Sequence, residues 1–164
     1  MKKKQVRRYE TVCCEMRRTL IGLMHQLKRQ GVEGNYVPAQ NLHLTLAFIG
    51  EYPDPEKVKA VIDSLSFPAF RLSLGDTGNF GDVFWIGVKG NQKLKSYVKE
   101  LRDALAAAGI PCDKGKFIPH ITLVRKFSSR SALKLPVPKG EMTVKKASLM
   151  KSEFKNGKTM YVEL

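Results

Sequence analysis

The sequence predicts an α+β domain with two pseudo-symmetric lobes, each a mostly antiparallel sheet with outer helices, and a groove between the lobes. At 164 residues the chain has the length of one ordinary domain with a sizeable core. Segments with a helical period alternate with short runs rich in β-branched and aromatic residues. The pattern His-x-Thr-Leu also occurs twice, at residues 43–46 and 120–123, each time after a helix-like segment. A repeated unit of helix and strand is therefore expected.

The first half contains two predicted helices and one predicted strand. Residues 15–29 predict a helix that ends before Gly31, because their apolar side chains recur at a 3.6-residue period: Met16, Leu20, Leu23, Met24 and Leu27. Residues 42–49 predict a strand between Pro38 and Gly50. Asp54 can cap a second helix, with Pro55 in its first turn, which ends before Pro68.

The second half contains a similar series. Strands are expected at 69–74 and 83–88, followed by a helix at 92–108 that closes at Gly109. The second motif strand is expected at 118–124, and a polar, proline-containing loop follows it. Residues 142–154 alternate well enough to predict one long strand, which the turn 155–158 connects to a final hairpin strand at 159–164.

The two halves align as an internal duplication within one domain, residues 1–164. Gly31 lies 78 positions before Gly109, and His43 lies 77 positions before His120. Segments 5–50 and 83–127 are thus equivalent, and a pseudo-twofold axis would bring the motif strands together in one cleft. The strand expected at 83–88 maps onto the more polar residues 5–10. A strand is predicted there as well, with a helical extension or a frayed terminus as the alternative.

Charge and cysteine content narrow the class of protein. The 29 Lys and Arg residues against 15 Asp and Glu residues give a net charge of +14, which favours a polyanionic partner such as nucleic acid. Cys13, Cys14 and Cys112 provide neither a disulfide framework nor metal-ligand spacing. No apolar stretch approaches the ~18 residues of a membrane span. The basic N-terminus lacks the apolar region of a signal peptide, so a cytoplasmic location is expected.

The two His-x-Thr motifs are the strongest indication of chemistry. Side chains alternate across a strand, so each motif presents an imidazole and a hydroxyl on the same side. Two copies in equivalent places favour a functional role over two satisfied core histidines. His25 has no such pattern and is expected to be a surface or half-buried residue. In-line displacement at phosphorus needs a base and an acid on opposite sides, and histidine titrates near neutral pH.

Other groups near the motifs fit the same chemistry. The hydroxyls of Thr45 and Thr122 can donate to the non-bridging phosphate oxygens, and Arg125 can add a charge-assisted contact. A metal site is a weaker hypothesis, because no Asp, Glu or Cys lies near the histidines at the sequence spacing typical of metal ligands. Neither a G-x-S-x-G elbow nor a Gly-rich phosphate loop occurs. Several aromatic residues are candidates to stack a base, although strand aromatics are more often core: Tyr36, Phe48, Phe80, Phe84, Trp85 and Phe117.

The runs NLHLTLAFIG and FIPHITLVR resemble the paired motifs of the two-histidine (2H) phosphoesterases. Within that superfamily the chain is most similar to the RNA 2′,3′-cyclic phosphodiesterase branch, also described as ligase-T-like 2′–5′ RNA ligases. The resemblance covers about residues 15–164. The chain departs from the family pattern at QVRRYETV, where the family usually has a short apolar strand.

The resemblance implies hydrolysis of RNA 2′,3′-cyclic phosphate ends to 2′-phosphomonoesters, with neither metal nor cofactor. It assigns acid–base catalysis to His43 and His120, with His43 taken as the acid, and substrate binding to Thr45, Thr122 and Arg125. The expected partners are RNA ends, tRNA fragments among them, or small cyclic nucleotides, but no membrane, and the chain is expected to be a monomer. Three alternatives stay open: 2′–5′ RNA ligation, a small-nucleotide cyclic phosphodiesterase, and a non-catalytic RNA-binding domain.

Overall fold

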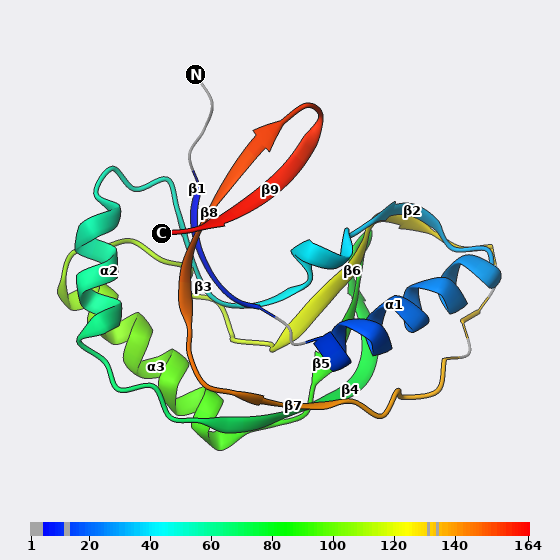
Figure 1. Cartoon of the computed structure of the whole chain (residues 1–164), viewed down its shortest axis with the longest axis horizontal. Coiled ribbons are helices and arrows are strands. Elements are labelled where there is room, and N and C mark those ends of the chain that lie inside the picture. Colours follow the sequence, from blue (N-terminus) through cyan, green and yellow to red (C-terminus); the bar gives the residue numbers. More distant parts are fainter. Residues whose placement is uncertain (1–4, 12–13, 131, 134) are drawn as a thin grey trace.

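The chain forms a strongly curved antiparallel sheet with helices on its outside (Figure 1). The computed structural model describes the backbone of all residues except 1–4, 12–13, 131 and 134, and side chains from residue 16 onward. The strands are β1 (Gln5–Thr11), β2 (Glu33–Tyr36), β3 (His43–Gly50), β4 (Phe70–Phe80), β5 (Val83–Val88), β6 (His120–Ser128), β7 (Glu141–Val144), β8 (Ser148–Lys155) and β9 (Lys158–Glu163).

The equivalent strands of the two halves lie at mirrored positions about the centre of the sheet. It runs β7-β4-β5-β6-β3-β1-β8-β9, so the two motif strands β6 and β3 are central neighbours. β5 lies beside β6 as β1 lies beside β3. The backbone registers also correspond, since Trp85 of β5 pairs with Thr122 and Tyr9 of β1 pairs with Thr45. Strand β2 adds to the far part of β6.

The ends of helices α2 (Pro55–Asp63) and α3 (Gln92–Ala107) lie where the local sequence favours them, and a short 3-10 helix covers Ala39–Asn41. α1 (Cys14–Arg29) lies on one side of the molecule, and α2 and α3 lie on the opposite side (Figure 1). The side chain of Asp54 accepts a hydrogen bond from the Lys57 amide at the start of α2, and Asn91 caps α3 through the Leu94 amide. Gly109 follows α3 with φ 73°, the left-handed conformation that glycine adopts without strain.

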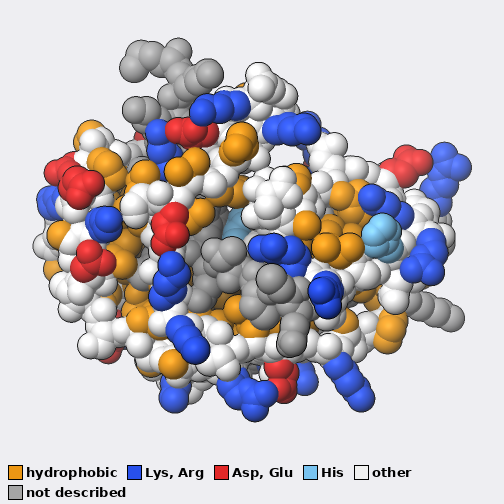
Figure 2. All heavy atoms as spheres, in the orientation of Figure 1, with side chains coloured by type: hydrophobic (Ala, Val, Ile, Leu, Met, Phe, Trp, Pro, Cys, Tyr) orange, Lys and Arg blue, Asp and Glu red, His pale blue; other side chains and the backbone are white. Residues whose placement is uncertain are grey.

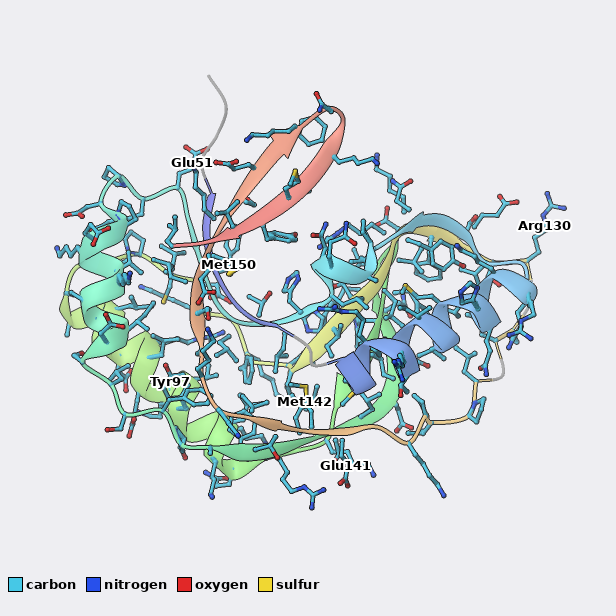
Figure 3. All side chains as sticks on the ribbon, viewed as in Figure 1. Glu51, Tyr97, Arg130, Glu141, Met142 and Met150 are labelled. Atoms are coloured by element: carbon cyan, nitrogen blue, oxygen red, sulfur yellow. The ribbon has the colours of Figure 1, made fainter. Side chains whose placement is uncertain are left out.

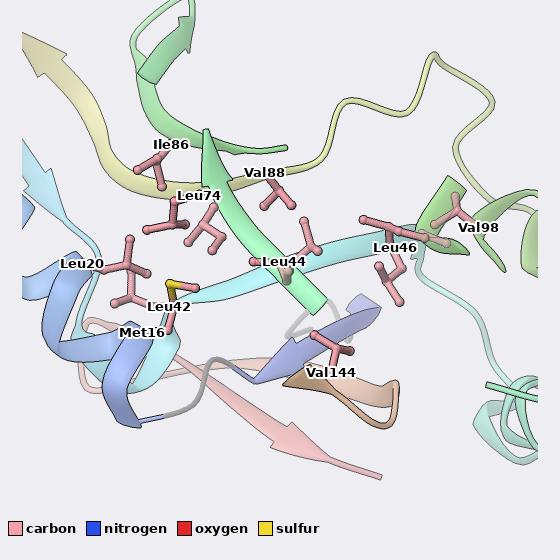
Figure 4. Packing of buried hydrophobic residues seen from close by; sticks show 14 of the residues in the cluster. Met16, Leu20, Leu42, Leu44, Leu46, Leu74, Ile86, Val88, Val98 and Val144 are labelled. Atoms are coloured by element: carbon pink, nitrogen blue, oxygen red, sulfur yellow. The ribbon is translucent and has the colours of Figure 1, made fainter. Parts of the chain in front are cut away.

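One hydrophobic core connects the helices and the sheet. Figure 4 shows Met16 and Leu20 of α1 beside Leu42, near Leu44 and Leu74, with Val98 of α3 packed beyond Leu46. These side chains are all buried. One face of β3 and β6 therefore packs against the core. The alternate side chains of these strands lie on the opposite face, which is partly exposed.

The structure confirms most of the expected elements. The helices over 15–29 and 92–108 and the strands over 42–49, 83–88 and 118–124 are present within a few residues, as is the final hairpin. The polar segment 5–10 is strand β1, as predicted. The helix after Asp54 ends at Asp63, before Leu65, and β4 continues to Phe80 as the first arm of a hairpin with β5.

The prediction of one long strand over 142–154 was wrong. The segment forms two strands that pair with different partners, β7 with β4 and β8 with β1. The chain leaves one edge of the sheet at Val144 and joins the other half at Ser148, so residues 145–147 form a connection in place of continuous strand. The short β2 was not expected, because its sequence EGNY has one aromatic residue, Tyr36, and no aliphatic side chain.

The structure also bears on membrane-spanning helices and on the cysteines. No helix in the part of the chain that the structure describes is long and apolar enough to cross a membrane. Cys112 is a free, partly buried thiol, and desolvation raises its pKa above the ordinary value. Cys13 lies outside the described residues.

Candidate functional site

The pairing of β3 with β6 places both motifs on one face of the sheet. Leu44 lies directly opposite Ile121, and both side chains point into the core with 2% and 1% of their surface exposed. Because side chains alternate along a strand, the histidine and threonine on each side of this pair lie on the other face. Continuing the antiparallel register by one residue places His43 opposite Thr122 and His120 opposite Thr45. All four side chains are partly exposed.

Each histidine ring is held by the backbone of its own segment. Nδ1 of His43 lies 2.6 Å from the carbonyl oxygen of Asn41, and Nδ1 of His120 lies 2.7 Å from the carbonyl oxygen of Ile118. A carbonyl oxygen can only accept, so Nδ1 carries the proton in both rings. Nε2 is then the nitrogen that can take up or release a proton, and the two rings are oriented in the same way.

A pocket of about 410 Å³ opens beside His43. Thr122 and Arg125 of β6 line it together with His43, and the β8–β9 hairpin supplies its other wall, with Phe154, Lys158 and Tyr161. Among the described residues that line this pocket there is no Asp or Glu, whereas Arg125 and Lys158 are both cationic. The pocket is therefore suited to an anion.

Aromatic rings flank both histidines. The ring of Tyr161 lies edge-on to His43 at 5.1 Å between centroids, and Phe80 meets His120 in the same way at 5.0 Å. Trp85 lies 5.7 Å from His120. The indole packs over Gly78, where an added Cβ would come within 2.5 Å of the ring. A glycine in β4 thus makes room for the aromatic wall beside His120.

The sequence-predicted residues are not all in one pocket. His43, Thr122 and Arg125 line the pocket described above, whereas His120 and Thr45 are two residues further along the paired strands, outside its lining. Arg125 is exposed. His25 is an exposed residue of α1, which agrees with the expectation of a surface histidine.

The aromatic candidates separate into different groups. Tyr36 lines the pocket, and Phe80 and Trp85 flank His120. Phe84 is buried against Phe127, so it belongs to the core. Phe48 is 36% exposed, and Phe117 lies under the guanidinium of Arg102 beside α3. In the described part of the chain no three His, Cys, Asp or Glu side chains form a cluster that could hold a metal ion.

Sequence reasoning missed the residues that connect His43 to the C-terminal hairpin. Asn41 is buried, and its side-chain amide donates to the carbonyl oxygen of Thr159 at 2.9 Å, while its own carbonyl accepts from His43. Tyr161 and Phe154 come from the same hairpin. Phe154 and Tyr161 are more than 100 positions from His43 in the sequence, and no local pattern predicts a contact over that separation.

The comparisons with known proteins agree with this arrangement. Residues 18–155 match the model of the 2′-5′ RNA ligase superfamily. An RNA 2′,3′-cyclic phosphodiesterase of Escherichia coli K12 is 35% identical over 137 residues, covering 80% of this chain and 77% of that protein. A protein of the same name from Thermotoga maritima is 31% identical over 121 residues, and the match covers 68% of this chain and 64% of that protein.

Solved structures show the same fold. The crystal structure of E. coli LigT in apo form superposes with a TM-score of 0.84 at 28% identity, covering 100% of this chain and 96% of that one. A crystal structure of LigT complexed with 3′-AMP superposes with a TM-score of 0.81 at 29% identity. With the family match over most of its length and the paired His-x-Thr-Leu strands at its centre, the chain belongs to the 2′-5′ RNA ligase superfamily of two-histidine phosphoesterases.

Proposed function

We propose that this protein hydrolyses 2′,3′-cyclic phosphate ends of RNA to 2′-phosphomonoesters, with His43 and His120 as its acid–base pair. The observation that carries the proposal is the matched state of the two rings. Each donates Nδ1–H to a backbone carbonyl, so each keeps Nε2 for proton transfer on the same face of two paired strands. The relatives named RNA 2′,3′-cyclic phosphodiesterase support this choice of substrate.

The reaction needs two proton transfers on opposite sides of phosphorus. In our assignment Nε2 of His120 takes a proton from water as its oxygen forms a bond to phosphorus. The bond from phosphorus to O3′ breaks, and His43 delivers a proton from Nε2 to the departing oxygen. The product keeps the phosphate on O2′. An imidazole can both accept and donate a proton near neutral pH, so a pair of histidines can fill the two roles.

The remaining groups act on the charge that builds up on the phosphate. Thr45 and Thr122 would donate hydrogen bonds to the non-bridging oxygens, each from the strand position opposite a histidine. Arg125 would bind the same phosphate from the pocket wall. Both histidines come from one chain, so a monomer suffices for this chemistry.

Ligation is the second candidate function, since the matching family model bears the name of 2′-5′ RNA ligases. Ligation is the reversal of the same displacement, with the 5′-hydroxyl of a second RNA in place of water. The high concentration of water favours hydrolysis unless a second RNA end is held at the site.

The test uses a short RNA that ends in a 2′,3′-cyclic phosphate, incubated with the purified protein in EDTA. Hydrolysis should yield a terminal 2′-phosphate, which mass spectrometry detects as one added water. Resistance to a 3′-specific phosphatase distinguishes it from the 3′ isomer. Formation of a 3′-phosphate, or turnover that requires a metal ion, would contradict the proposal, and a longer RNA with a 2′–5′ linkage would favour ligation.

A further inference from the structure

The β8–β9 hairpin presents an aromatic residue to solvent at the edge of the site. Phe154 is 62% exposed, although its ring lines the pocket that contains His43. Register pairs Phe154 with Thr159 and Ser152 with Tyr161, so Phe154 and Tyr161 lie on the same face of the hairpin. Tyr161 meets the ring of His43, and Phe154 lies two residue pairs further along the hairpin, toward its tip. Two aromatic rings therefore extend outward from the histidine.

The end of the hairpin carries a cation that pairs with no acidic side chain among the described residues. Lys155 and Lys158 are directly opposite one another, which is unfavourable for like charges. Lys155 forms an ion pair with Glu153 at 3.4 Å, and Glu153 also pairs with Lys151. The register places Lys158 on the opposite face of the hairpin from Phe154, but Lys158 follows the turn directly and still lines the pocket. No described side chain forms an ion pair or a hydrogen bond with it. An anion bound there would relieve the repulsion between the two lysines.

The hairpin is also fixed to the catalytic strand. The side chain of Asn41 donates to the carbonyl of Thr159, and the carbonyl of Asn41 accepts from His43. This connection gives Phe154 and Lys158 a defined position relative to the reacting phosphate. Figure 1 shows the hairpin projecting beyond the rest of the sheet, with its tip toward solvent.

We propose that Phe154 and Lys158 form a subsite for the nucleotide that precedes the cyclic phosphate end of the RNA. The base of this nucleotide stacks on Phe154, and the phosphodiester that joins it to the terminal nucleotide contacts Lys158. An exposed aromatic ring beside an unpaired cation has the chemistry that single-stranded nucleic acid requires. The inference rests on the proposed function, and it makes RNA of two or more nucleotides the preferred substrate over a mononucleotide.

The test compares a dinucleotide with a mononucleotide, both carrying a 2′,3′-cyclic phosphate. Phe154→Ala should lower the ratio of their kcat/KM values, dinucleotide over mononucleotide, by roughly 5- to 100-fold, the usual effect of losing one stacked base. Phe154→Leu should lower this ratio by a similar factor, because leucine keeps the apolar bulk of the side chain but has no ring on which a base can stack. Lys158→Ala should make the salt dependence of dinucleotide binding shallower by about one contact.

Met160→Ala is the matched control. Met160 is 50% exposed on the same hairpin and is absent from the pocket lining, so its removal should leave the ratio unchanged. An unchanged ratio in Phe154→Ala, or an equal fall in Met160→Ala, would overturn the subsite.

A binding measurement separates this inference from the proposed function. Calorimetry with a dinucleotide that ends in a 2′-phosphate, and with a nucleoside 2′-phosphate, needs no turnover. Phe154→Ala should weaken only the dinucleotide, and equal affinities of the unaltered protein for the two ligands would exclude the subsite even if hydrolysis occurs. Selective weakening without any hydrolysis would support the subsite and reject the proposed reaction.

Discussion

Asn41 connects His43 to the C-terminal hairpin. It is 9% exposed, and its backbone carbonyl orients His43 while its side chain reaches a strand more than 100 residues away. A buried amide that satisfies a backbone carbonyl is costly to remove, because the carbonyl is left without a partner. The orientation of His43 therefore depends on contacts outside its own motif.

We expect Asn41→Ala to destabilise the fold by about 1–2 kcal/mol and to lower kcat by roughly tenfold or more, since a misplaced ring reacts poorly. Thermal melting and single-turnover kinetics measure the two effects. Asn79→Ala is the control, because Asn79 also donates to a backbone carbonyl, that of Gly81, but in an exposed turn. A stability loss with unchanged kcat would restrict Asn41 to a structural role.

Arg125 gives a second prediction at this scale. Arg125→Ala should lower kcat/KM by roughly 10- to 100-fold for mononucleotide and oligonucleotide substrates alike, because in the proposed reaction it contacts the phosphate that both share. Arg130→Ala removes the same charge from a side chain that points into solvent at the far end of the molecule (Figure 3). Equal effects of the two substitutions would mean that only the overall charge matters.

Among the elements, those with strong local patterns were predictable and those that depend on distant partners were not. The stripe from Met16 to Leu27 and the caps at Asp54 and Asn91 act within a few residues, so they define helices directly. The break between β7 and β8 depends on which strands are available at two separate edges of the sheet. β2 forms only because β6 offers it a partner.

In the candidate site, too, residues set by a local pattern were predictable and residues set by distant contacts were not. The motif pairs His43 with Thr45 and His120 with Thr122 by strand alternation, which the sequence reveals. The hairpin residues around the pocket depend on a register between β8, β9 and β1 that no local pattern specifies. Whether these catalytic and binding roles are correct stays a prediction, as does the internal duplication, which the mirrored strand order supports.

The β4–β5 hairpin yields a prediction of its own. Gly78→Ala should force Trp85 away from His120, because the new methyl group would lie 2.5 Å from the ring in the present structure. Overpacking of this kind costs about 1–3 kcal/mol. We expect a lower melting temperature, altered tryptophan fluorescence and reduced turnover. Gly90→Ala, where a Cβ meets nothing within 4 Å, should change none of these, and unaltered fluorescence in Gly78→Ala would contradict the packing.

For the whole molecule, the curved sheet brings equivalent strands of the two halves into contact at its centre. β3 and β6 each contribute one histidine and one threonine, so neither half contains both histidines of the proposed acid–base pair. Lys and Arg side chains are spread over the middle of the face shown in Figure 2, and several acidic side chains lie toward α2. The net charge of +14 gives the molecule as a whole a field that favours polyanions.

Binding of RNA should therefore depend strongly on salt. If three or more phosphates contact basic side chains, the logarithm of the affinity for a single-stranded oligonucleotide should fall with log salt at a slope of about −2 or steeper. Fluorescence anisotropy across a salt series measures this slope. The preference for oligonucleotides over mononucleotides should shrink as salt rises, and a slope near zero would show that the basic surface contributes only to solvation.

The most direct test of the central claim is the turnover of cyclic-phosphate RNA by three variants: His43→Ala, His120→Ala and the double substitution. Each single variant should lose roughly 10²–10⁴-fold in kcat, the usual contribution of a positioned acid or base. The double variant should be little worse than either one, because the two groups act in one reaction. Either single variant retaining full turnover, with its fold verified by circular dichroism, would contradict a two-histidine mechanism.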